Sequence, residues 1–453
     1  MLIFTYMKIK FQGAAGTVTG SSYVLTSDSG ESILIDYGMF QGVEDPSATL
    51  GASSRNFAPL QCDVSKLFGM VLTHAHLDHC GRIPRLLEQG FNQQIWMTAP
   101  TKDITEISLY DSAKINHNNH KKIIYTKIDV ENVIKLFRIV SYEEKFSIGS
   151  FDITMRDAGH ILGSASLEII DKSAKGNFKK IVFSGDLGNS PQDLIKPTEL
   201  ITNADAVVME STYGDKDHPE GNPSDSIQSE INIVEKEGGI LLIPSFSIER
   251  SQEIMHIIYH LKKSGRIKNE TTILFDSPMA EKVNKVFEKY SGLYNNEFKE
   301  DFTNNDPFEF PGLLSRSQEE IEPKVIIAGS GMMSGGKIVG YAAEYLPIKS
   351  TRLLIVGFQG EETLGRTLLS GKKLVDIEGE RITVNATIND IRTMSSHAGQ
   401  SQLMKWLKNI NGVQKLFITH GEDEPRKILS VKIKNELNIT DITLPKLNDE
   451  CII

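Results

Sequence analysis

Short apolar runs divide the first 210 residues into segments whose length and content predict strands. Isoleucine, valine and phenylalanine are frequent in these runs, and glycine, aspartate or serine usually follows. Runs of this kind between turn residues are typical of buried strands. The predicted strands lie at 8–12, 23–26, 32–35, around 71–72, and at 95–98, 151–158, 180–183 and 206–209. Helices are expected at 82–89 and 101–115.

From about residue 238 the pattern changes to a regular alternation of strand, loop and helix. Apolar runs at 239–243, 272–275, 325–328 and 353–356 each lead into a loop that contains glycine or serine. Such alternation predicts a mostly parallel, doubly wound sheet. Residues 291–322 are polar, and we expect them to form an excursion or cover.

The last part of the chain returns to the first pattern. Residues 381–396 are extended in character, and an apolar run at 415–418 predicts one more buried strand. Residues of metal-binding type lie on both sides of the strand–helix block, which suggests a domain inserted into a split one. We therefore predict one domain made of 1–210 and 381–453, with residues 211–380 inserted.

Composition and charge narrow the function classes. The 453 residues can bury a large core, and their 40% hydrophobic and 24% charged content is ordinary for a soluble protein. A formal net charge of −10 argues against a protein that coats nucleic acid nonspecifically, although it leaves room for a local basic groove. Three scattered cysteines and the lack of an apolar run of membrane-spanning length favour a cytoplasmic protein without a membrane contact.

The stretch from Val71 to Gly81 carries the strongest chemical signal. An apolar run ends in His74-x-His76-x-Asp78-His79, which places four potential metal ligands within a few residues. Alternation along an extended chain would turn His74 and His76 to the same side. Imidazole and carboxylate without thiolate suit zinc, with manganese or iron as alternatives. The pair His117 and His120 lacks an apolar strand to position it, and we interpret it as a solvated face.

Other apolar runs also end on residues of the same chemical type. His160 and Asp186 follow predicted strands, Glu210 ends one directly, and His420 follows the last strand. This repetition predicts that the strands bring these side chains to one edge. Asp36, at the end of another run, is expected to support a neighbouring histidine as a hydrogen-bond partner rather than to bind metal.

The loops of the inserted block suggest a surface that binds phosphate. Glycine-rich turns and helix N-termini at the carboxyl ends of parallel strands accept phosphate groups, although a tight turn explains the glycines equally well. The candidate residues are Ser245, Arg250, Ser277, Ser330, Gly331, Gly335, Gly336 and Arg366.

These motifs together resemble the metallo-β-lactamase fold, and specifically its β-CASP branch of nucleic-acid-processing nucleases. The ordered motifs are Asp36, His74-x-His76-x-Asp78-His79, His160, Asp186, Glu210 in Glu-Ser-Thr-Tyr-Gly, His397 in Ser-His-Ala, and His420 in Thr-His-Gly-Glu. The resemblance implies an α/β chain, an αββα sandwich with an inserted β-CASP domain on a mostly parallel, doubly wound sheet. The resemblance covers nearly the whole chain, and the chain is similar to the compact two-domain members.

Within the branch, the last motif residue separates substrates. RNA-cleaving members carry histidine at the position of His420, whereas DNA-repair members carry valine there. The resemblance therefore implies hydrolysis of single-stranded RNA. Endonuclease action is expected, and 5′-exonuclease action stays open. Gly399 and Tyr37 depart from residues common in the branch, which places specificity in doubt more than catalysis.

The resemblance also implies a role for each motif residue. His74, His76 and His160 would bind one zinc ion, Asp78, His79 and His420 a second, and Asp186 both. His397 is the candidate general acid, with Glu210 as its carboxylate neighbour, so that the products carry a 5′-phosphate and a 3′-hydroxyl. The residues expected to act in catalysis are Asp78, Asp186, Glu210 and His397.

Three other functions remain open from the sequence. A zinc hydrolase of small esters could use the same fold, but it would not need the inserted domain. A non-catalytic RNA-binding scaffold is a second alternative, although here every motif position is filled. DNA as the main substrate is a third. A homo-oligomer is compatible with the sequence.

Overall fold

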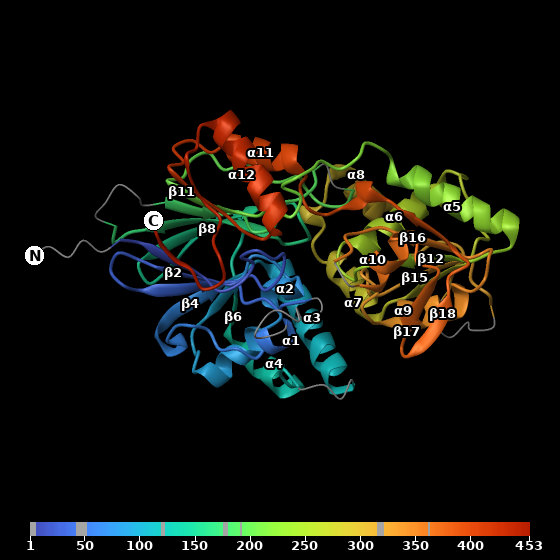
Figure 1. Cartoon of the computed structure of the whole chain (residues 1–453), viewed down its shortest axis with the longest axis horizontal. Helices are drawn as coiled ribbons and strands as arrows, with labels where there is room; N and C mark the ends of the chain where they lie inside the picture. Colours follow the sequence, from blue (N-terminus) through green and yellow to red (C-terminus); the bar gives the residue numbers. More distant parts are fainter. Residues whose placement is uncertain are drawn as a thin grey trace, which may run out of the picture. The chain divides into compact units, whose positions relative to one another are not determined.

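The described residues form two compact units. The computed structural model describes residues 6–41, 52–118, 123–174, 180–190, 193–314, 321–360 and 363–453, with only the backbone at 52–53, 115–118 and 392. The first unit comprises Met1–Asp217 and His397–Ile453, and the second is His218–Ser396 (Figure 1). The side chains of His117 and His120 lie outside the described residues.

The first unit is built on two mixed sheets. In the described chain each sheet has seven strands. The first sheet has the order β22 (Glu450–Ile452), β1 (Lys8–Phe11), β2 (Tyr23–Thr26), β3 (Ser32–Ile35), β4 (Leu67–Val71), β5 (Ile95–Met97), β6 (Phe137–Ile139). The second has the order β21 (Asp441–Thr443), β20 (Lys415–Ile418), β11 (Ala206–Met209), β10 (Lys180–Phe183), β9 (Ala165–Asp171), β8 (Phe151–Asp157), β7 (Lys145–Ile148).

The two sheets pack face to face around one apolar core. Alternate residues of both sheets meet there, and Phe11 of β1 lies 5.3 Å from Phe417 of β20 between ring centroids. Side chains on the outer face of the first sheet pack with α3 (Ala99–Asn118) and α4 (Lys127–Val133), and those of the second pack with α11 (Gln400–Lys408) and α12 (Asp423–Leu437). Helix, sheet, sheet and helix therefore form four layers, which confirms the predicted αββα sandwich.

The second unit contains the predicted parallel sheet. Within the described residues its strands are all parallel, in the order β14 (Leu313–Leu314), β13 (Ile273–Asp276), β15 (Val325–Ala328), β12 (Leu241–Pro244), β16 (Arg352–Ile355), β19 (Thr387–Asp390). Both faces of β12 are buried, because α9 (Lys337–Tyr345) packs on one side and α5 (Pro223–Glu237) contacts the same strand. Apolar residues without alternation are what a strand covered on both faces requires.

The second unit runs further along the chain than the predicted limits of 211 and 380. Residue 380 lies in a hairpin of β17 (Leu374–Ile377) and β18 (Glu380–Thr383), and β19 pairs with β16. These pairings keep the chain in the second unit until Ser396. The extended pattern of 381–396 is therefore part of the second unit's own strands rather than a return to the first unit.

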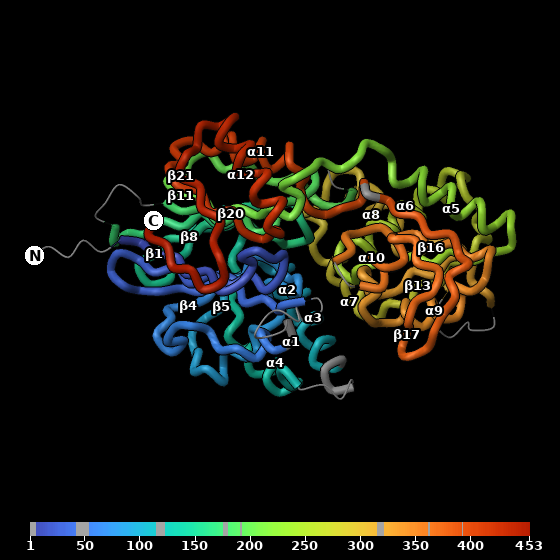
Figure 2. Tube along the Cα trace, viewed as in Figure 1, coloured from blue at the N-terminus to red at the C-terminus, as the bar shows by residue number. Residues whose placement is uncertain are grey.

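Two further differences concern the ends of strands. The strand before the histidine cluster ends at Val71, so His74 and His76 lie in a loop and not on a strand. The C-terminal β22 pairs antiparallel with β1, and Figure 2 shows this last segment beside β1. No helix among the described residues is long and apolar enough to cross a membrane.

Candidate metal centre

Strand ends bring the motif residues together in the first unit. In the second sheet β10, β11 and β20 are parallel neighbours, and Met209 pairs in register with Ile418. Glu210 follows Met209 directly, His420 lies two residues after Ile418, and Asp186 lies three residues after the end of β10, so the three lie at one edge. His74 and His76 come from the loop after β4, and Asp78 and His79 lie in the short helix α2 (Leu77–Cys80) that follows.

A first group of ligand atoms comes from His74, His76, His160 and Asp186. These atoms all lie within 4.8 Å of one another. His74 Nε2 is 3.4 Å from Asp186 Oδ2, and His160 Nε2 is 3.7 Å from the same oxygen and 3.1 Å from His76 Nδ1. Three imidazole nitrogens and one carboxylate thus face a common point, an arrangement that could hold one cation.

A second group comprises Asp78, His79, His420 and again Asp186. Its ligand atoms also lie within 4.8 Å of one another. His79 Nε2 is 3.3 Å from Asp186 Oδ2 and 3.2 Å from His420 Nε2, while His420 Nε2 is 3.4 Å from Asp78 Oδ2. Because Asp186 belongs to both groups, its carboxylate could bridge two cations.

The chemistry of these atoms fits metal better than it fits a network of hydrogen bonds. His74 Nε2 and both Asp186 carboxylate oxygens are buried and have no hydrogen-bond partner among the described residues. Asp186 Oδ2 lies 3.4 Å from His74 Nε2 and 3.3 Å from His79 Nε2, and both distances exceed usual N–H···O lengths. Ligands about 2.0–2.1 Å from one tetrahedral ion would lie about 3.3 Å apart. A cavity of about 20 Å³ beside these atoms is bordered by His79, Asp186 and His420 together with core residues such as Tyr23 and Phe183.

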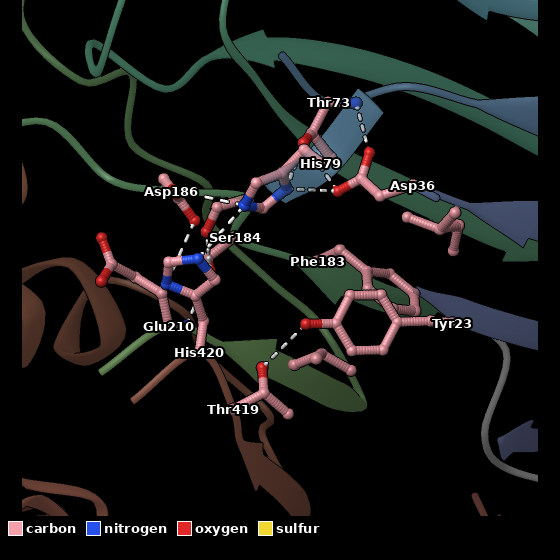
Figure 3. Close-up of a pocket in the computed structure, with 13 residues that line it drawn as sticks. Tyr23, Asp36, Thr73, His79, Phe183, Ser184, Asp186, Glu210, Thr419 and His420 are labelled. Atoms are coloured by element: carbon pink, nitrogen blue, oxygen red, sulfur yellow. Dashed lines mark hydrogen bonds and ion pairs between the residues drawn. The ribbon is translucent and has the colours of Figure 1, made fainter. Parts of the chain in front are cut away.

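Asp36 and Thr73 fix which nitrogen each histidine presents. His79 Nδ1 lies 2.8 Å from Asp36 Oδ2, and the Thr73 hydroxyl donates to that same oxygen at 2.8 Å (Figure 3). Because the Thr73 hydroxyl donates its one proton to Asp36, it can only accept a hydrogen bond from His74 Nδ1, which lies 3.1 Å away. Both histidines therefore carry their proton on Nδ1 and turn Nε2 toward the ligand groups. Asp36 itself belongs to neither ligand group.

Thr212 holds His420 in the same way from the opposite side. The Thr212 hydroxyl lies 3.0 Å from His420 Nδ1 and donates to the His420 carbonyl oxygen at 3.3 Å. Nδ1 is therefore the donor, and Nε2 faces His79. Sequence reasoning assigned no role to Thr73 or Thr212, although each stands beside a motif residue.

Burial and charge set the protonation of most of the ligands. Burial lowers the pKa of His74 well below its usual value and that of His76 to about 4. Burial raises the pKa of Asp186, but His420, His79 and His74 outweigh it and hold that pKa well below its usual range. These groups are thus in the forms that bind metal, neutral imidazole and carboxylate. For His79, burial is outweighed by Asp186 and Asp36, which raise its pKa, so a bound cation must displace a proton.

His397 and Glu210 form a separate pair beside the two groups. His397 Nδ1 lies 3.3 Å from Glu210 Oε1, and Glu210 accepts backbone N–H donation from Leu187 at 2.8 Å and Thr212 at 3.1 Å. Burial lowers the pKa of His397, but Glu210 outweighs it and raises that pKa to about 9. The His397 side chain is 18% exposed, whereas His74 and His160 are fully buried. A protonated histidine thus faces solvent beside the ligand groups, although Glu210, His397 and His420 are also close enough to hold a metal.

Apart from the two arginines, the candidate phosphate-binding residues of the second unit lie in the loops after β12, β13 and β15. We call residues 245–247, 277 and 329–336 the loop cluster. A Cβ added to Gly329 would lie 3.7 Å from Ser247 Oγ and 3.8 Å from Ser277 Oγ, so these loops are neighbours. Ser247 was not predicted, yet its hydroxyl lies 3.1 Å from that of Ser277.

Contacts within the loop cluster account for several of its residues. The Ser245 hydroxyl donates to the Phe246 carbonyl at 3.2 Å, and the Ser330 hydroxyl donates to the Gly335 carbonyl at 3.2 Å. A Cβ at Gly331 would lie 2.4 Å from the Phe246 ring, and one at Gly336, where φ is +75°, would lie 2.4 Å from the Gly329 oxygen. Gly335 has φ +157° and open space around it.

The two candidate arginines differ in their surroundings. Arg250 is buried and forms an ion pair with Glu253 on the same helix, α6 (Arg250–Lys263). Its guanidinium is therefore committed to an internal partner, which argues against the predicted contact with substrate. Arg366, near the start of α10 (Leu364–Leu369), is exposed.

Comparison with protein families matches three stretches of the chain. Residues 43–236 match the Beta-lactamase superfamily domain, and residues 251–368 match the Beta-Casp domain. Residues 381–445 match the Zn-dependent metallo-hydrolase RNA specificity domain. This last match begins before the second compact unit ends at Ser396.

Among curated proteins, similar chains include two named ribonucleases. Ribonuclease TTHA0252 of Thermus thermophilus is 32% identical over 455 residues, which cover 98% of this chain and 99% of that protein. RNase aCSPSF2 of Saccharolobus solfataricus is 30% identical, covering 94% of this chain and 82% of that protein. Transcription termination factor FttA of Pyrococcus horikoshii is 31% identical, and the match covers 83% of this chain and 60% of that protein.

A solved structure shares the fold at low sequence identity. It is a protein of unknown function from Enterococcus faecalis, with a TM-score of 0.54 and 11% identity. The match covers 99% of this chain and 100% of that one, and at this identity it concerns the fold alone.

Proposed function

Because the chain belongs to the β-CASP family of the beta-lactamase superfamily, and is therefore a metal-dependent hydrolase, we propose that it cleaves phosphodiester bonds of single-stranded RNA. The observation that supports this most directly is the pair of ligand groups sharing Asp186, with protonated His397 beside them. The named ribonucleases among its relatives and the RNA specificity match at 381–445 point to RNA as substrate. Endonuclease action is the main mode we propose, with 5′-exonuclease action as a second.

Two cations, zinc first with manganese or iron as alternatives, would be held by the two groups. His74, His76 and His160 would bind one, Asp78, His79 and His420 the other, and Asp186 both. When bound, such cations activate water and neutralise charge on the phosphate oxygens. The protein's own part is to present Nε2 of His74 and His79, which the contacts of Asp36 and Thr73 secure.

His397 would supply the proton that the leaving oxygen needs. Glu210 lies at Nδ1, so the proton to be transferred is held at Nε2. Two backbone N–H groups fix the Glu210 carboxylate, which in turn fixes the ring and favours its charged form. Donation to the 3′-oxygen leaves a 3′-hydroxyl on one product and a 5′-phosphate on the other.

The second unit would bind the phosphates of the strand. The loop cluster joins strand ends to the helices α7 (Pro278–Phe287) and α9, whose N-cap residues are Ser277 and Gly336. Backbone N–H groups at helix N-termini attract anions. We assign Ser247, Ser277, Ser330, the glycines at 331, 335 and 336, and the exposed Arg366 to this surface.

The test is cleavage of an internally labelled single-stranded RNA beside a DNA of the same sequence. We expect internal cuts in RNA, and 5′-phosphate ends by end-group analysis. Cleavage of a thiolester with neither strand cut would instead favour a small-ester hydrolase. Binding of RNA by the metal-loaded chain without cleavage would favour a scaffold.

A further inference from the structure

A second cluster of metal-binding side chains lies in the second unit, apart from the candidate metal centre. His256 and His260 are one turn apart on α6, and Asp301 lies on α8 (Asn296–Asn304). Their ligand atoms all lie within 4.8 Å of one another. Figure 1 shows α6 and α8 in this unit. The proposed hydrolysis of RNA makes no use of these residues.

The three ligand atoms form a nearly regular triangle. His256 Nε2 is 3.0 Å from His260 Nε2 and 3.2 Å from Asp301 Oδ2, and His260 Nε2 is 2.7 Å from that oxygen. Side chains four apart on a helix lie on one face. Two histidines at this spacing are a common zinc-binding pair, and a carboxylate is a usual third ligand.

The surroundings hold two of the ligands rigidly and leave the third accessible. His256 is buried, and its ring packs edge to face against Phe298 of α8 at 5.0 Å. The Asp301 side chain is only 7% exposed, and Lys263 Nζ binds its other oxygen, Oδ1, at 2.9 Å. His260 is 36% exposed, so a cation can reach the triangle from solvent.

We propose that His256, His260 and Asp301 bind a divalent cation of the zinc type, which fastens α8 to α6. Helix α8 belongs to the polar excursion at 291–322, and its apolar side is held by aromatic contacts such as Phe287 with Phe298. Asp301 lies three residues after Phe298 on the same buried face of α8, so a cation would add a second attachment on that face. Because Lys263 carries like charge beside Asp301, it weakens the affinity of the site without supplying a ligand atom.

The test counts metal by mass spectrometry in the purified full chain, after stripping with a chelator and reloading with excess zinc. The background variant is Asp186→Ala, which is expected to lose the cations of the candidate metal centre. That variant should retain about one zinc per chain, and the double variant with His260→Ala should retain none. His260 is partly exposed, so its replacement is expected to leave the fold intact, which circular dichroism checks.

Two further variants guard against misinterpretation. Asp301→Asn keeps the size of the side chain and should weaken zinc binding by at least about tenfold. Lys263→Ala, the matched control on the same helix, retains every ligand atom and should tighten binding. The proposal is overturned if zinc content and affinity are the same with and without His260. Retention of more than about one zinc by Asp186→Ala would instead count against the proposed centre in the first unit.

Discussion

At the candidate metal centre, His74 Nε2 and both oxygens of Asp186 are buried with no hydrogen-bond partner in the described chain, whereas in the loop cluster the hydroxyls of Ser245 and Ser330 already donate to backbone carbonyls. Unpaired buried polar atoms are costly, and a bound ion is one way to satisfy a cluster of them. Loops that satisfy their own hydroxyls can bind through backbone N–H groups and shape. The first region therefore fits metal ions, and for the second we propose that it binds the phosphates of the strand.

The largest effect is expected from Asp186→Asn, which keeps the size of the side chain but removes the charge shared by both groups. We expect loss of bound metal from the centre and a fall in RNA cleavage of more than about 10⁴-fold, because the two proposed cations would lower the activation barrier. Metal analysis and a cleavage time course measure the two effects. Full activity with full metal would remove Asp186 from the centre.

His397→Ala should separate chemistry from metal binding. Loss of a general acid typically costs about 10²–10⁴-fold in turnover. The metal content should equal that of the unmodified chain, since His397 is not one of the proposed ligands. If zinc is lost together with activity, then His397 binds metal with Glu210 and His420, and the role proposed for it is wrong.

Asp36→Asn tests the support behind the ligands. The Asp36 carboxylate accepts from His79 Nδ1 and the Thr73 hydroxyl through one oxygen and from the Thr73 backbone N–H through the other, whereas an amide has only one acceptor oxygen. We expect the affinity for metal to fall about tenfold to 100-fold, as it does when such supporting partners are removed. Activity should recover at high zinc concentration, which distinguishes this variant from Asp186→Asn; an unchanged affinity would contradict the support role.

Glu210→Gln should move the pH dependence of cleavage. His397 must be protonated to act, so the rate falls as the pH rises through its pKa. Glu210 raises that pKa to about 9 in the metal-free chain. Without its charge the pKa falls, and the alkaline limb of kcat/KM should shift to lower pH by about one unit. Bound cations would lower the pKa of His397 in the unmodified chain and in Glu210→Gln alike, so the variant's alkaline limb is still expected at the lower pH. An alkaline limb at the same pH would contradict the pairing.

The smallest effect concerns the second unit. Arg366→Ala should raise KM for RNA by about twofold to fivefold without a change in kcat, because one exposed ionic contact contributes little. Arg250→Ala is the comparison variant. It should lower thermal stability, since Glu253 loses its ion-pair partner, and leave KM unchanged. Equal KM effects from both would contradict the different surroundings of the two arginines.

The sequence predicted the strands of the first unit that consist of an apolar run followed by a polar residue, such as β10, β11 and β20, but it did not predict β6, β7 or β9. The edge where Asp186, Glu210 and His420 meet follows from those runs, since β10, β11 and β20 are parallel neighbours. The predicted boundary at 380 is not where the second unit ends. The residues before and after 380 both have the sequence pattern of strands, and only the pairing of β19 with β16 shows that the later ones belong to the second unit.

Residues that meet only in three dimensions were missed. The β22 strand is only three residues long, and its pairing with β1 joins opposite ends of the chain. His256 and His260 have helical metal-pair spacing in the sequence, but their partner Asp301 lies in a polar stretch on another helix. Thr73 and Thr212 stand within recognised motifs, and only the hydrogen bonds reveal what they hold.

The most direct test of the central claim is a zinc titration of the stripped His260→Ala chain, with bound metal and RNA cleavage measured in the same samples. This variant lacks the proposed α6 site, so binding reports the centre in the first unit. We predict that cleavage appears as that centre fills and reaches its limit at about two zinc ions per chain. Cleavage by the stripped chain, or a filled centre that cuts no RNA, would contradict the account.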